Sequence, residues 1–103
     1  MRGLNKLIIS GNVSGDINYA TLPSGGEVLS FSIASDRRSS GGGVLTVWVR
    51  INVFMEPLVR ICRERLVKGG YVLVEGELMN RDGSCGRLTE VRAWEIIFVP
   101  KAG

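Results

Sequence analysis

Residues 44–54 alternate between two kinds of side chain over almost their whole length. β-Branched residues occupy the odd positions of the second half: Val47, Val49, Ile51 and Val53. The even positions there carry two aromatic rings, a guanidinium and an amide: Trp48, Arg50, Asn52 and Phe54. Because successive side chains of a strand point to opposite faces, the pattern predicts a strand that buries the first row and presents the second.

Weaker patterns of the same kind predict four further strands. We expect them at residues 4–13, around residues 29–33, at 71–79 and at about 87–99, separated by turn-forming residues at 14–16, 22–26 and 80–83. Residues 37–43 are basic and rich in serine and glycine, which predicts a loop. After Pro57, Leu58, Ile61, Cys62 and Leu66 recur at helical spacing, which predicts one short helix.

The order of these elements limits the fold. An open five-stranded sheet would expose its edge strands, and closure into a small barrel removes that exposure. We therefore expect an all-β protein, a five-stranded OB-fold barrel with one short helix between the third and fourth strands. A length of 103 residues fits one domain, residues 1–103.

The aromatic and basic row predicts a surface for single-stranded nucleic acid. Bases stack on aromatic rings while cations follow the phosphates, and this recognition tolerates any sequence. Trp48, Arg50 and Phe54 are the first candidates, with Arg37 and Arg38 in the preceding loop. The alternative is that the row packs under a loop or in a subunit contact, and for Phe54 alone both interpretations stay open. An unpaired, buried Arg50 would be costly, which favours the binding surface.

Several classes of function are disfavoured. The chain has no histidine, no nucleophile or Walker motif, and only two cysteines, Cys62 and Cys85, so we expect no enzyme activity, metal site or cofactor. No apolar stretch approaches membrane-spanning length and no signal peptide is visible, so a cytoplasmic protein without a membrane partner is expected. Trp94 has the parity of Ile96 and Phe98, which favours the core or a subunit interface over ligand contact.

Several segments resemble the bacterial single-stranded DNA-binding protein family. Residues 2–13 carry the Asn-Lys, aliphatic run and Gly-Asn of that family in order, and the likeness continues at 23–26, 31–35, 48–54 and 66–76. The resemblance implies an OB fold that assembles as a homotetramer and binds single-stranded DNA without sequence preference. It also implies protection of that DNA in replication, recombination and repair, association with the nucleoid, and contacts with replication or repair proteins.

The resemblance also implies roles for particular residues. Trp48 and Phe54 match base-stacking positions, Arg50 and Lys68 match basic positions near the DNA, and Arg2 and Lys6 lie in the basic N-terminal segment. The remaining candidate contacts lie in the predicted hairpin turn and at the start of the last predicted strand: Arg81 and Arg87. The ending, residues 98–103, lacks the linker and acidic tip of the family, so we expect a short version. The alternatives are a short primosomal OB protein that acts as a dimer and an OB-fold adaptor that binds proteins.

Overall fold

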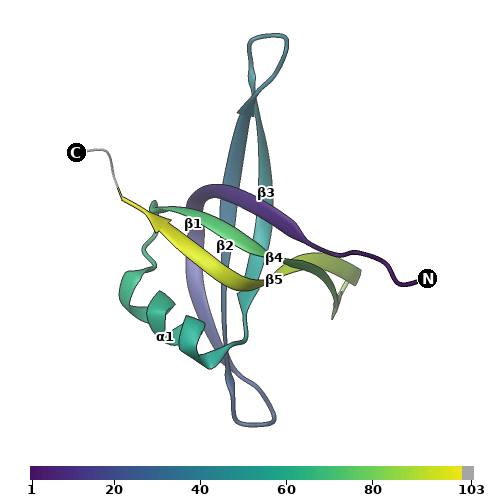
Figure 1. Cartoon of the computed structure of the whole chain (residues 1–103), viewed down its shortest axis with the longest axis vertical. Helices are drawn as coiled ribbons and strands as arrows, with labels where there is room; N and C mark the ends of the chain where they lie inside the picture. Colours follow the sequence, from purple (N-terminus) through teal and green to yellow (C-terminus); the bar gives the residue numbers. More distant parts are fainter. Residues whose placement is uncertain (101–103) are drawn as a thin grey trace.

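The strands form a closed barrel in a computed structural model, which describes residues 1–100 (Figure 1). The elements in chain order are β1 (Leu7–Thr21), β2 (Glu27–Arg38), β3 (Val44–Val53), α1 (Glu56–Arg65), β4 (Tyr71–Gly83) and β5 (Gly86–Val99). Around the barrel the order is β1-β2-β3-β5-β4, which confirms the predicted OB fold and the helix between the third and fourth strands. Among the described residues, no helix combines the length and apolar character needed to cross a bilayer. The predicted short ending extends into residues 101–103, outside this description.

Closure of the barrel depends on one long strand and one short parallel contact. β1 pairs with β4 through its first half and with β2 through its second half, and the register with β2 shifts between Ser14 and Asn18. The turn predicted at residues 14–16 is therefore wrong, because an irregularity bends β1 without ending it. The barrel closes where Ile51–Val53 of β3 lie parallel to Val91–Ala93 of β5.

The core fills the barrel, and the helix covers one end of it. Phe31, Leu29, Ile33, Ile51 and Val53 from β2 and β3 are completely buried. From α1 the buried side chains are Leu58, Val59 and Cys62, and Leu66 follows at the helix end. Ile61, predicted on this face, is 45% exposed, so the helix packs through Val59 in its place.

Two glycines allow backbones to approach closely. A Cβ atom at Gly76 would overlap the carbonyl oxygen of Arg92, and one at Gly11 would overlap the carbonyl oxygen of Ala34. Gly76 lies where the register between β4 and β5 shifts, since Glu75 is opposite Glu95 while Gly76 is opposite Ala93. Trp94 is the additional residue in β5, so this position is a β-bulge.

The β2–β3 hairpin extends beyond the barrel as a two-stranded ribbon, residues 35–47, in which β2 and β3 pair only with each other (Figure 1). Arg37 and Arg38 belong to β2, so the predicted loop is confined to residues 39–43. In the ribbon no second layer covers the β-branched face, and Val47 is 55% exposed. The predicted burial of that row holds for Ile51 and Val53, which lie inside the barrel.

The hairpin between β4 and β5 also begins later than predicted. Residues 80–83 were expected to turn, but β4 continues through them and pairs with the start of β5. The connection consists of Ser84 and Cys85. Arg81 therefore has a fixed strand position, opposite Leu88.

Candidate nucleic-acid interface

Trp48 lies on the outer face of β3 and is 68% exposed. Its partner on β2 is Ala34, and the next residue on the same face, Arg50, is opposite Ser32. Ala34 and Ser32 are too small to cover an indole ring or a guanidinium group. The two strands thus present an uncovered ring and, two residues along, a half-buried cation.

Asn52 was predicted on the presented row, but it is 5% exposed. Ser30 Oγ donates a hydrogen bond to Asn52 Oδ1 (3.0 Å), and Asn52 Nδ2 donates to Glu90 Oε1 (2.8 Å). The amide therefore joins β2, β3 and β5 beneath the surface. Asn52 therefore stabilises the strand surface that carries Trp48 and Arg50, and its own side chain is not available for ligand contact.

Arg81, a predicted nucleic-acid contact, forms an ion pair with the buried Glu90. Arg81 Nε donates to both carboxylate oxygens at 3.2 Å, and Arg81 Nη2 donates to Oε2 at 2.8 Å. The hydrogen bond from Arg81 lowers the pKa of Glu90 against the opposing effect of burial, and the Asn52 hydrogen bond and the charges of Arg81 and Arg50 add to the lowering. Because this pairing satisfies its charge, Arg81 has less capacity for a phosphate than an unpaired arginine.

We expect Glu90 to make stability depend on acid pH. A carboxylate whose folded pKa is depressed contributes stability that is present above the unfolded pKa, about 4.3, and is lost as pH falls through the folded value. Glu90→Gln should therefore lower the free energy of unfolding near neutral pH, and its difference from the wild type should shrink in acid. Urea unfolding at a series of pH values measures this.

The matched control for this experiment is Glu64→Gln. Glu64 is exposed on α1 and forms no hydrogen bond or ion pair with other side chains of the described chain. The Glu64→Gln variant should therefore show a dependence of unfolding free energy on pH close to that of the wild type. A constant difference between Glu90→Gln and wild type down to pH values well below the unfolded pKa would contradict the prediction.

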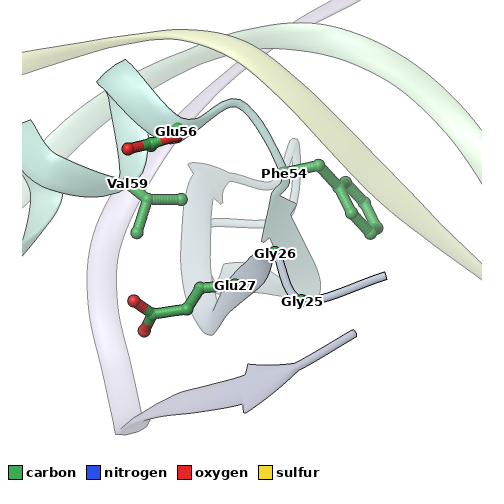
Figure 2. Close-up of a pocket in the computed structure, with 6 residues that line it drawn as sticks. All are labelled: Gly25, Gly26, Glu27, Phe54, Glu56 and Val59. Carbon is green, nitrogen blue, oxygen red and sulfur yellow. The ribbon is translucent and has the colours of Figure 1, made fainter. Parts of the chain in front are cut away.

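Phe54 follows the end of β3 and is half-buried. The guanidinium carbon of Arg92, on β5, lies 5.0 Å from the centre of its ring. The ring borders an open pocket of about 340 Å³, whose lining also includes Gly25, Gly26, Glu27, Glu56 and Val59. Figure 2 shows the ring turned away from the two carboxylates of this lining. Both carboxylates are paired with arginines of α1, whereas Arg92 beside the ring forms no ion pair within residues 1–100, so a phosphate near Phe54 would be attracted from the Arg92 side.

The other predicted basic residues differ in how far their charges are matched. Lys6 pairs with Glu75 at 3.0 Å, and Arg87 lies 3.8 Å from Asp82. Five predicted contacts form no ion pair within residues 1–100: Arg2, Arg37, Arg38, Arg50 and Lys68. The structure does not gather all of these residues at one place.

The ribbon separates the two adjacent arginines. Arg38 is opposite Val44 and therefore shares the face of Trp48, whereas Arg37 is opposite Leu45 on the other face. Within the described residues, no cluster of three or more Cys, Asp or Glu side chains is placed to hold a metal ion. The arrangement offers an aromatic ring and cations, which are the groups that contact bases and phosphates.

Trp94 and Arg92 are exposed residues that the sequence did not assign to the site. Trp94 is 37% exposed, while Ala93 and Ile96 are buried, so its predicted place in the core is wrong. The bulge opposite Gly76 changes the parity of β5 between Trp94 and Ile96. No sequence signal near Trp94 marks that change. Contact of Trp94 with another subunit remains a prediction.

Comparisons with known proteins agree with one another. Residues 4–97 match the sequence model of the Single-strand binding protein family. Single-stranded DNA-binding proteins of Rickettsia typhi and Rickettsia felis are 35% and 34% identical over 83 residues, covering 76% of this chain and 55% of theirs. The chain thus spans about half the length of these curated relatives.

Solved structures of similar proteins cover nearly the whole chain. A Plasmodium falciparum SSB in complex with ssDNA has a TM-score of 0.83 at 27% identity, covering 97% of this chain and 98% of that chain. The mitochondrial single-stranded DNA-binding protein Rim1 of S. cerevisiae has a TM-score of 0.79 at 28% identity, covering 95% and 96%. The barrel and its connections are therefore shared with these proteins.

Proposed function

The chain belongs to the single-strand binding protein family, and from this we propose that residues 1–103 form one domain that binds single-stranded DNA without sequence preference. Bases stack on Trp48 while the half-buried Arg50 and exposed cations such as Arg38 contact the phosphates. The observation that carries the proposal is the exposed Trp48 ring next to Arg50, on a strand face where only small residues lie alongside. The similar Plasmodium falciparum SSB, whose structure is a complex with ssDNA, supports it.

The proposal includes a cellular role. A protein that coats single strands protects them in replication, recombination and repair, and it acts where such strands occur, at the nucleoid. The family consists of non-catalytic DNA-binding proteins, and we propose that this chain likewise has no enzymatic activity. Replication or repair proteins are its proposed partners besides DNA.

Self-association is also part of the proposal. The outer faces of β1, β4 and β5 expose apolar side chains: Ile8, Tyr71, Ile97 and Val99. Apolar side chains exposed on neighbouring strands are common at protein interfaces. A homotetramer is proposed, and sedimentation at several concentrations separates it from the dimer.

The test is binding of fluorescein-labelled oligothymidine, followed by fluorescence anisotropy. Trp48→Ala should weaken binding by about 1–3 kcal/mol, or about 5- to 150-fold in Kd, because one stacked base is lost. Val47→Ala is the matched control, since Val47 is exposed on the opposite face of the same strand. Equal affinities for wild type and Trp48→Ala would exclude the stacking platform, and Trp48 would then fit a protein interface.

A further inference from the structure

We propose that Arg92 and Trp94 form a second contact for the same DNA strand, on β5, in continuation of the row on β3. Nothing in the sequence patterns assigned either residue to binding. The inference rests on the proposed function and extends it to a residue pair that would take one base and one phosphate. Four observations on placement, charge and exposure support it.

Strand pairing places the two rows side by side. β3 and β5 are parallel neighbours, with Asn52 beside Arg92, so outward residues of both strands share one surface. Arg92 and Trp94 are two residues apart and precede the parity change at the bulge, so both point outward. Along the strands, four steps separate Trp48 from Asn52 and two separate Arg92 from Trp94, about 20 Å in total at the usual rise.

The Phe54 ring holds the Arg92 side chain in place, but no carboxylate of the described residues pairs with its charge. Its guanidinium lies over the Phe54 ring, and although Glu77 is opposite it on β4, no ion pair involves Arg92 within residues 1–100. A cation held over a ring retains donors at its edge for phosphate oxygens.

A second arginine–aromatic pair in the molecule shows the contrast. Arg63 lies over Tyr19 at 4.3 Å but also pairs with Glu27, so its charge is matched. Arg92 over Phe54 is therefore able to bind an anion such as a phosphate. Arg63, between Tyr19 and Glu27, is suited to holding α1 against the barrel.

Trp94 supplies the ring for a base. It is 37% exposed although its neighbours Ala93 and Ile96 are buried, so the bulge directs a large aromatic side chain out of the barrel. An exposed indole next to an unpaired cation is the pair of groups that single-strand binding uses at Trp48 and Arg50. The Phe54 ring lies beneath Arg92 and follows β3, the strand that carries Trp48 and Arg50.

The experiment uses the emission of Trp94 itself. Trp48→Phe retains an aromatic ring at position 48 and leaves Trp94 as the one tryptophan of the chain. We expect its emission to be quenched as oligothymidine of about 16 nucleotides, the upper site size of an OB fold, binds. The anisotropy of the labelled strand reports binding independently.

Affinity provides the second measurement. In the wild-type background, Trp94→Ala and Arg92→Ala should each raise the Kd of the longer strand about five-fold or more, with little effect on a strand of about four nucleotides held by the β3 row. Tyr19→Ala, which removes the ring of the charge-matched pair, should leave the Kd unchanged.

The outcomes separate the two proposals. Strong binding by anisotropy with unchanged Trp94 emission, and a Kd of Trp94→Ala equal to that of the wild type, would overturn this inference and leave the proposed function intact. Absence of any anisotropy change with the wild-type protein would overturn both.

Discussion

Gly76→Ala is expected to destabilise the barrel more than alanine at any other glycine of residues 1–100. The new Cβ would overlap the carbonyl oxygen of Arg92 and lie 2.9 Å from its carbonyl carbon. Both atoms are backbone, so no side-chain rotation relieves the overlap, and β4 must move from β5. The cost should be at least about 3 kcal/mol, the upper part of the range for overpacking. That is a large share of a total stability of about 5–15 kcal/mol.

Gly41→Ala is the matched control for this variant. Gly41 lies in the loop of residues 39–43, and a Cβ there would meet no atom within 4 Å. Its stability should be unchanged or higher by up to about 1 kcal/mol, because alanine restricts the unfolded chain. Urea unfolding followed by far-ultraviolet circular dichroism compares the two. Equal midpoints for Gly76→Ala and wild type would mean that the bulge accepts a side chain.

The double charge reversal Arg37→Glu/Arg38→Glu should cause the second large effect, on DNA affinity. Loss of the Arg38 phosphate contact reduces the magnitude of the slope of log K against log salt by about 0.7 and weakens binding about 8-fold near 0.05 M salt. The added repulsion of two carboxylates increases that loss. Titrations at several salt concentrations measure both quantities, and an unchanged slope would remove the ribbon from the binding surface.

The single variants locate the DNA on the ribbon. Arg38 shares the face of Trp48, and Arg37 lies on the face of Leu45. Arg38→Glu should therefore account for most of the effect of the double variant, and Arg37→Glu for little. Equal contributions would indicate that the strand contacts both faces of the ribbon.

Part of the site was predictable from residues 44–54 alone. A period of two residues is a property of the extended backbone, so it places Trp48 and Arg50 on one face whatever surrounds the strand. Period does not determine which part of a face is covered. Asn52 follows the same period, yet it is buried because Ser30 and Glu90, from strands far away in the sequence, bond to its amide.

The pairing of charges also depends on tertiary structure and not on the sequence alone. Sequence composition indicates how many arginines the chain has, but not which of them have partners. Arg81 is paired with Glu90, nine residues away, because the β4–β5 hairpin continues past its predicted turn. Arg92 has a carboxylate-bearing neighbour on the facing strand and still forms no ion pair within residues 1–100.

The sequence by itself determined the order of five strands and one helix, the OB barrel, and the face of Trp48, because these follow from local periodicity and from the need to close an open sheet. Only the tertiary structure decided where the barrel ends and the ribbon begins, that Trp94 points outward, and which arginines keep a free charge. Those features depend on the register between strands that are distant along the chain. At Gly76 a single residue of register shift turns the side chains of β5 from one face to the other.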